Sequence, residues 1–118
     1  MRGDLDLVLV RFAPDYHYDP PREWLIAGMP DEYEGHAGLR QWAADLREAW
    51  DFLDHTPLEV VDAGDKIAFL CRIRLRARTS GIELESRLGQ VFWVEQGLIV
   101  RETDFGDWDE ALRVVGAR

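Results

Sequence analysis

The feature that most constrains the fold is the alternating stretch 66–95, which the turn dipeptide Ser80-Gly81 divides into two halves. Side chains on a strand point to opposite faces in turn, so strict alternation predicts a hairpin with one apolar and one charged face. On the first strand, the apolar face consists of Ile67, Phe69, Cys71, Ile73 and Leu75. The charged face of that strand consists of Arg72, Arg74, Arg76 and Arg78.

We expect Ser80-Gly81 to form a two-residue loop, which would fix the register of the hairpin. This register pairs Arg76 with Glu85 on the charged face. On the apolar face it pairs Cys71 with Gln90, a polar amide that needs a hydrogen-bond partner or water there. Gln90 is therefore either a satisfied core residue or a sign that this face lines a cavity.

The charged face becomes apolar far from the turn, in a patch formed by Ala68, Leu70, Val91 and Trp93. An apolar patch of this kind indicates a covering partner, either a helix or a second subunit. We predict a homodimer that forms through the sheet face around Trp93.

Composition narrows the class of protein. A chain of 118 residues forms one domain, 1–118, with a single core of ordinary size. The net charge of −9 argues against nucleic acid or an anionic membrane as partner, because both need clustered cationic side chains. The single cysteine can form no disulfide within the chain, and the sequence has neither a signal-peptide pattern nor a long apolar run. We expect a cytoplasmic protein.

The rest of the chain supplies helices around this hairpin. Apolar periodicity predicts helices at 3–12 and 38–53, the latter ended by Thr56-Pro57, and a short helix capped by Asp107. Strands are expected at 15–19, 58–62 and 98–105. This order predicts an α+β fold, in which helices pack on one face of a curved antiparallel sheet. Such a sheet curls into a cone, and its wide end leaves a pocket.

The chemistry expected in this pocket is acid–base chemistry by carboxylates. The sequence has no glycine-rich phosphate loop and no nucleophile elbow, and its three histidines are scattered, so we expect neither a metal nor a cofactor. Asp104 ends the last strand and Asp19 ends the first, each next to aromatic residues. Burial in an apolar pocket can raise the pKa of such a carboxyl toward neutrality.

The direction of the Asp104 side chain depends on one turn. A two-residue loop at Gln96-Gly97 places Asp104 opposite Gly89, on the face away from Gln90. A three-residue loop, or a bulge in the last strand, reverses this.

Aromatic side chains are the candidates for binding a small apolar substrate. They are Tyr16, Tyr18, Trp24, Trp42, Trp50 and Phe92. The same residues fit equally well as core, because an aromatic stripe on a helix usually packs inward.

Three groups of segments resemble, in order and spacing, the SnoaL-like branch of the nuclear transport factor 2-like superfamily. They are Gly3-Asp4-Leu5-Asp6 with Phe12-Ala13-Pro14-Asp15, then Tyr33-Glu34-Gly35-His36-Ala37-Gly38-Leu39, then Gln90-Val91-Phe92-Trp93 with Gly97-Leu98-Ile99-Val100. The resemblance implies a cone with a deep pocket, often in a dimer. The superfamily includes ketosteroid isomerases, polyketide cyclases, limonene epoxide hydrolases and non-catalytic members.

The resemblance also implies site residues. Asp104 matches the segment in which the epoxide hydrolases hold a catalytic Asp, although no acid stands at 71–74, where the partners of that Asp lie. Asp19 resembles the base of the ketosteroid isomerases, with a spacing one residue shorter, and Gln90 stands where they keep a protonated Asp. The family's first helix has no counterpart in this sequence. That difference predicts an opened cone, a neighbouring chain over the exposed surface, or a natural protein that starts earlier.

Two functions fit these observations. The first is an isomerase, cyclase or hydrolase that acts on a small apolar substrate with Asp104, Asp19 and Gln90 as catalytic residues. The second is a non-catalytic ligand-binding or dimerisation module with the same cone.

Overall fold

The computed structural model describes residues 11–21, 30 and 32–116. Its elements are β1 (Phe12–Asp19), β2 (Tyr33–Glu34), α2 (Gly35–Ala49), β3 (Trp50–Asp62), β4 (Lys66–Ala77), β5 (Glu83–Glu95), β6 (Leu98–Phe105) and α3 (Trp108–Val114). The helix expected at 3–12 lies outside the described residues, except for its last two positions, and Phe12 already belongs to β1. Among the described residues, no helix has the length and apolar character needed to cross a membrane.

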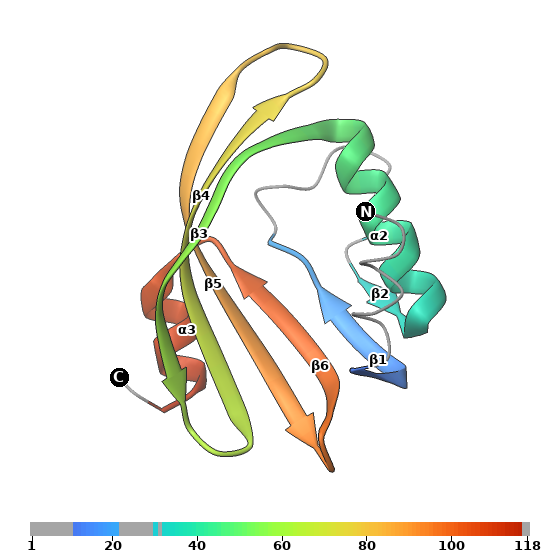
Figure 1. Ribbon diagram of the computed structural model, residues 1–118, viewed down its shortest axis with the longest axis vertical. Coiled ribbons are helices and arrows are strands. Elements are labelled where there is room, and N and C mark those ends of the chain that lie inside the picture. Colours follow the sequence, from blue (N-terminus) through green and yellow to red (C-terminus); the bar gives the residue numbers. More distant parts are fainter. Residues whose placement is uncertain (1–10, 22–29, 31, 117–118) are drawn as a thin grey trace.

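The six strands form one curved sheet in the order β2-β1-β6-β5-β4-β3. Strands β3 to β6 make the antiparallel meander that the sequence predicts, whereas β1 runs parallel to β6. Figure 1 shows the long strands β3, β4 and β5 bending toward the side on which α2 lies. The curved α+β sheet expected from the sequence is therefore present, with one parallel pair in it.

The two helices lie on opposite faces of the sheet, which corrects the expectation that all helices share one face. Helix α2 covers the concave face, where Trp42 and Leu39 join the core built on Tyr16, Tyr18 and Ile73. Helix α3 packs on the outer face through Ala111 and Val115.

The partner of the outer apolar patch is thus a helix, because α3 buries Ala68, Leu70 and Val91. Gly89 allows this close contact. A Cβ atom at position 89 would lie 2.6 Å from the Cβ of Ala111.

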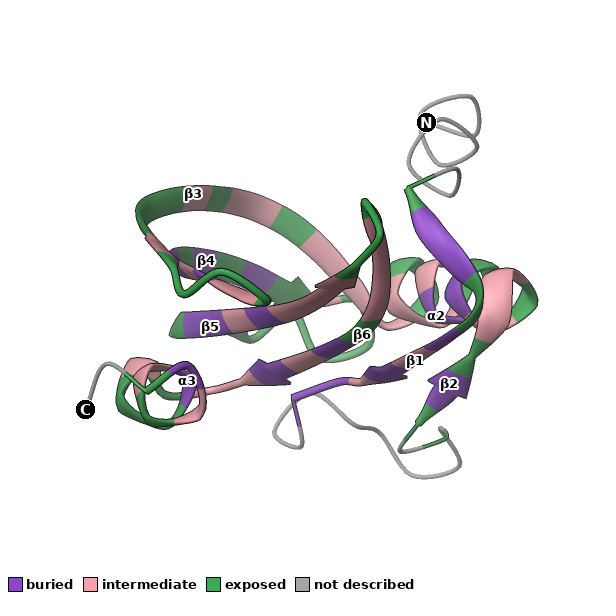
Figure 2. Ribbon diagram, turned by 90° about the horizontal axis from the view of Figure 1, so that it is seen from below, coloured by how far each residue is buried: buried purple, intermediate pink, exposed green. Residues whose placement is uncertain are grey.

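Helix α2 ends four residues earlier than expected, at Ala49, and β3 begins at Trp50. Trp50 and Leu53 continue the helical apolar period, but the chain pairs with β4 instead, starting with Trp50 opposite Ala77. Pairing with a neighbouring strand overrides a local helical pattern of this kind. Pro57 lies inside β3 and is tolerated because β3 is the edge strand, most of which is exposed or half-buried (Figure 2).

The register of the central hairpin differs from the expected one by two residues. Arg76 pairs with Glu83, and Cys71 pairs with Leu88. The cause is a wider turn. Strand β4 ends at Ala77, and the N–H of Ala77 donates a hydrogen bond of 2.9 Å to the carbonyl of Ile82. A shift of two residues preserves the face of every side chain, so the predicted apolar and charged faces are correct.

Candidate active site

A bulge in β6 determines where Asp104 points. The turn at Gln96-Gly97 has two residues, but Val94 pairs with Ile99 while Trp93 pairs with Arg101, so Val100 is an extra residue in β6. The bulge reverses the facing of all residues that follow it. Asp104 therefore lies opposite Gln90 on the concave face, which is the second of the two arrangements considered above.

A cavity of about 180 Å³ lies between the concave face and α2. It is lined by Tyr18, Trp42, Leu46, Phe52, His55, Ile73, Leu88, Gln90, Glu102 and Asp104. The structure thus brings together four of the residues singled out from the sequence: Tyr18, Trp42, Gln90 and Asp104.

Two carboxylic acids, Glu102 and Asp104, lie side by side on the cavity face of β6, and we call them the carboxyl pair. Their exposed fractions are 7% and 5%. Burial raises the pKa of Asp104 to about 6. Burial and the neighbouring Asp104 carboxylate together raise the pKa of Glu102 well above its ordinary value. The two acids therefore titrate as a coupled pair, which holds a proton to a higher pH than isolated carboxyl groups do.

Two polar side chains contact the carboxyl pair. The hydroxyl of Tyr18 donates a hydrogen bond of 2.6 Å to Oδ2 of Asp104. Nε2 of Gln90 donates a longer bond of 3.4 Å to Oε2 of Glu102, while its Oε1 accepts from Sγ of Cys71 at 3.6 Å. Gln90 is therefore both a partnered amide and part of the cavity wall.

The nearby phenols and thiol are neutral groups. Burial and the charges of the carboxyl pair raise the pKa values of Tyr16 and Tyr18 well above the usual range. Burial, with a smaller effect from Asp104, raises the pKa of Cys71 to about 11, so its thiol is a poor nucleophile and fits the expected role of a core residue.

The structure separates Asp19 from this site. Its carboxylate accepts hydrogen bonds from His17 at 2.9 Å and from Arg101 and Thr103, both at 3.0 Å. Partial burial acts to raise the pKa of Asp19, but these hydrogen bonds outweigh it and lower the pKa. Asp19 is an ionised, paired carboxylate that does not line the cavity, and its position gives no support to a role as base.

The remaining predicted binding residues lie elsewhere. Tyr16 is fully buried and stacks on Tyr18 at 6.5 Å between ring centroids. Trp50 packs against the core at the start of β3, and Phe92 makes an edge contact with Phe69 at 5.4 Å. None of these three lines the cavity. Trp24 falls outside the described residues.

Sequence reasoning missed Glu102, Phe52 and His55. Glu102 had a usable signal, since a residue two positions before Asp104 on a strand shares its face. Phe52 and His55 belong to β3, but they fall in the segment that was assigned to a helix and its end.

Two other features of the described residues lie outside this cavity. His17, Asp19 and Glu32 bring possible metal-ligand atoms within 4.8 Å of one another, but Asp19 is already bonded to Arg101. The absence of a metal remains a prediction.

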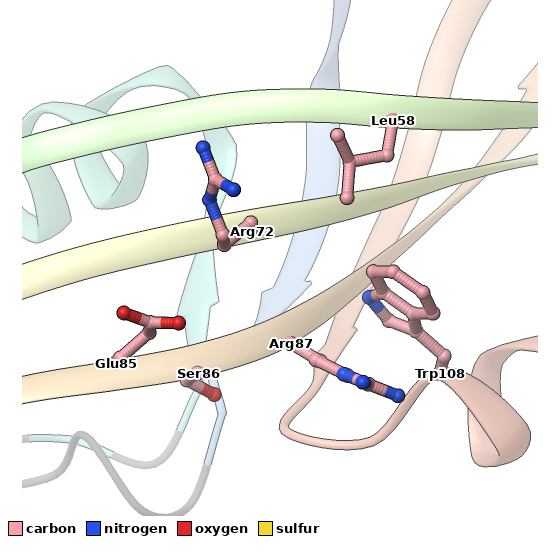
Figure 3. Close-up of a pocket in the computed structure, with 6 residues that line it drawn as sticks. All are labelled: Leu58, Arg72, Glu85, Ser86, Arg87 and Trp108. Carbon is pink, nitrogen blue, oxygen red and sulfur yellow. The ribbon is translucent and has the colours of Figure 1, made fainter.

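Figure 3 shows the second feature, a wider hollow of about 400 Å³ lined by Leu58, Arg72, Glu85, Ser86, Arg87 and Trp108. The guanidinium of Arg87 lies 5.0 Å from the centre of the Trp108 ring. Neither buried acid lies in this hollow, so it is not the candidate active site.

The fold is an α+β cone with a partly open cavity on the concave face of its sheet. The family model of the SnoaL-like domain matches residues 1–102, so the chain belongs to this family. No protein of curated function matches the chain.

Solved structures agree with this family. A nuclear transport factor 2-like protein from Burkholderia thailandensis is 27% identical, with a TM-score of 0.74 over 98% of this chain and 85% of that chain. TerC, crystallised with polyporic acid, is 17% identical, with a TM-score of 0.75 over 97% and 87%. A ketosteroid isomerase-like protein from Catenulispora acidiphila, in complex with trimethylamine, is 14% identical, with a TM-score of 0.71 over 97% and 83%.

Proposed function

We propose that this chain is a SnoaL-like enzyme that transfers a proton to or from a small molecule held in the cavity, with Asp104 as the base. The observation that carries the proposal is the buried carboxyl pair at the cavity wall, with the Tyr18 hydroxyl 2.6 Å from Asp104. Efficient general bases have a pKa close to the working pH, and burial moves Asp104 toward that range.

The three polar groups have complementary roles in this proposal. Asp104 accepts the proton from the substrate. Glu102 in its protonated form, which burial and Asp104 favour, is the hydrogen-bond donor for a developing negative charge. Tyr18 holds the Asp104 carboxylate in place through their hydrogen bond.

The cavity volume limits the substrate. An apolar cavity of about 150 Å³ in another protein accommodates benzene. A cavity of about 180 Å³ therefore suits a molecule the size of one ring, with a larger substrate extending through the mouth beside Phe52 and His55.

The experiment uses nitrobenzisoxazole, a carbon acid whose base-promoted ring opening gives a coloured phenolate. We expect the wild-type chain to accelerate this reaction and Asp104→Asn to lower the rate by about 100-fold or more. Glu85→Gln, an exposed carboxylate on the outer face, is the matched control and should keep the rate. Equal rates for Asp104→Asn and wild type would eliminate Asp104 as the base.

The second candidate is a binding module without catalysis. The apolar part of the wall, from Leu46, Ile73 and Leu88, favours it because these side chains offer contact area and no chemistry. Saturable binding of nitrobenzisoxazole without ring opening would support this candidate over the enzyme.

We also propose that the chain acts as a single domain and pairs with a second copy through the outer face around Trp93. Trp93 is half-buried, at the edge of the patch under α3, and the guanidinium of Arg101 lies 5.3 Å from its ring centre. An interface there would extend the apolar cover that α3 begins.

A further inference from the structure

The cavity contains acids without a matching cation. Among the described residues that line it, two are carboxylic acids and none is Lys or Arg. His55, exposed at the mouth, is the one basic side chain of this lining. Burying a negative charge is costly unless a positive group or several hydrogen bonds compensate it.

The hydrogen bonds of the carboxyl pair are incomplete. Oδ2 of Asp104 is bonded by Tyr18, whereas Oδ1 makes no close hydrogen bond among the described residues, although Glu102 and Gln90 also stabilise this carboxylate as neighbouring donors. This oxygen belongs to a side chain that lines the cavity. Protein atoms enclose it almost completely, so the pair acts on a bound molecule through its negative charge and not through this oxygen.

Three aromatic side chains also line the cavity. Tyr18 comes from β1, Trp42 from α2 and Phe52 from β3, and we call these three residues the aromatic wall. The rings of Tyr18 and Trp42 are 5.3 Å apart, which places two electron-rich rings together beside the acids. Aromatic faces attract quaternary and alkylated ammonium groups, and the attraction is strongest where water is excluded.

We propose that the ligand of this cavity carries a single positive charge, in an alkylammonium group held in the cavity beside the carboxyl pair and in contact with the aromatic wall. This inference rests on the cavity being the functional site, as in the proposed function, and it names the class of substrate. The volume of about 180 Å³ fits a group of that size. Solved relatives of this fold hold ligands of different kinds, so the residues of the lining, and not the fold, select the charge.

The proposal requires that no neighbouring titratable group neutralises the negative charge of the carboxyl pair. Facing the pair are Tyr16 and Tyr18 from β1 and Cys71 from β4, whose raised pKa values keep them neutral below about pH 11. Gln90 from β5 is uncharged. From β3, His55 is the remaining titratable group of the lining. On the α2 side, Tyr33 bonds Asp45 at 2.8 Å, outside the lining.

The experiment compares choline with dimethylbutanol, its uncharged carbon isostere, by calorimetric titration of the full chain. A desolvated cation–aromatic contact predicts that choline binds at least about tenfold more tightly than dimethylbutanol. The preference should increase as the pH rises through about 6, because a cation favours the ionised form of Asp104. Binding should therefore release protons, which titrations in two buffers of different ionisation enthalpy detect.

Two variants locate the effect. Asp104→Asn combined with Glu102→Gln should abolish the preference for choline over dimethylbutanol. Phe52→Leu should weaken choline several-fold more than it weakens dimethylbutanol, and the fold should tolerate it because Phe52 is 42% exposed. Circular dichroism of each variant verifies that it is folded.

Equal or tighter binding of dimethylbutanol overturns the inference, as does the absence of choline binding to the folded chain. These outcomes are separate from those of the proposed function. If the chain opens nitrobenzisoxazole but prefers the neutral isostere, the proposed enzyme activity stands and the cationic ligand is excluded. If it prefers choline but opens no ring, the cationic ligand stands and the proposed proton transfer is excluded.

Discussion

The hydroxyl of Tyr18 donates a hydrogen bond of 2.6 Å to Oδ2 of Asp104, between two strands, β1 and β6, that run parallel. The residues are 86 positions apart in the sequence. The bond stabilises the ionised carboxylate and so opposes the effect of burial on the pKa of Asp104.

Tyr18→Phe should therefore raise the pKa of Asp104. A hydrogen bond to a charged group contributes about 1.5–3 kcal/mol, which corresponds to a shift of about 1–2 pH units. The shift can be followed by carbon-detected NMR titration of the carboxyl groups. Tyr33→Phe, which loses a bond to Asp45 outside the cavity, is the matched control. An unchanged titration of Asp104 in Tyr18→Phe would contradict this account.

Asp104 should make the chain less stable as the pH rises, whereas a carboxylate in a surface ion pair makes a protein more stable as the pH rises. The pKa of Asp104 is raised in the folded state from 3.8 to about 6, so the folded state binds more protons than the unfolded state in this window. The contribution of Asp104 to the free energy of unfolding is therefore largest below 3.8 and is lost as the pH rises to about 6. Asp19, whose pKa is lowered, contributes the reverse dependence.

Asp104→Asn should then stabilise the chain above pH 6, by about 1–3 kcal/mol, because the cost of a buried charge is removed. Glu102→Gln is the comparison, since burial and Asp104 favour the neutral form of Glu102 and a neutral amide of the same shape should change stability little. Urea unfolding at several pH values measures both. A loss of stability in Asp104→Asn at high pH would show that other groups in the folded chain stabilise the ionised carboxylate.

Gly89→Ala should destabilise the packing of α3. The added Cβ would lie 2.6 Å from the Cβ of Ala111, so the helix has to move. Overpacking of this kind costs about 1–3 kcal/mol in a well-packed core. Adding Ala111→Gly removes the clash and should recover part of the loss, which denaturant unfolding of the single and double variants would reveal. Additive losses would argue against a direct contact.

Trp93→Glu should give monomers if two chains pair around this residue. A charge at the centre of an apolar interface carries a desolvation cost that the interface cannot offset. Light scattering gives the mass. Ile82→Glu, at the exposed tip of the β4–β5 hairpin, is the control and should leave the mass unchanged. An unaltered mass for Trp93→Glu would exclude an interface there.

The apolar and charged faces of the β4–β5 hairpin were predictable, because alternation along a strand is a local property of the sequence. The pairing register was not, since it depends on a turn two residues wider than the shortest one. The end of α2 was missed for a similar reason. Trp50 and Leu53 fit a helical period, and their strand state follows from pairing with β4, which no local pattern contains.

The sequence alone determined that the chain forms an α+β fold with a curved sheet and that Cys71 lies on the apolar face of its strand, since these follow from residue type and periodicity. Tertiary structure decided the rest. Because Val100 is an extra residue in β6, the side chains of Asp104 and Glu102 face the cavity, and the curvature of the sheet brings Tyr18 and Trp42 close to them. A single residue added to a strand exchanges its two faces, and only the completed ladder fixes where that residue goes.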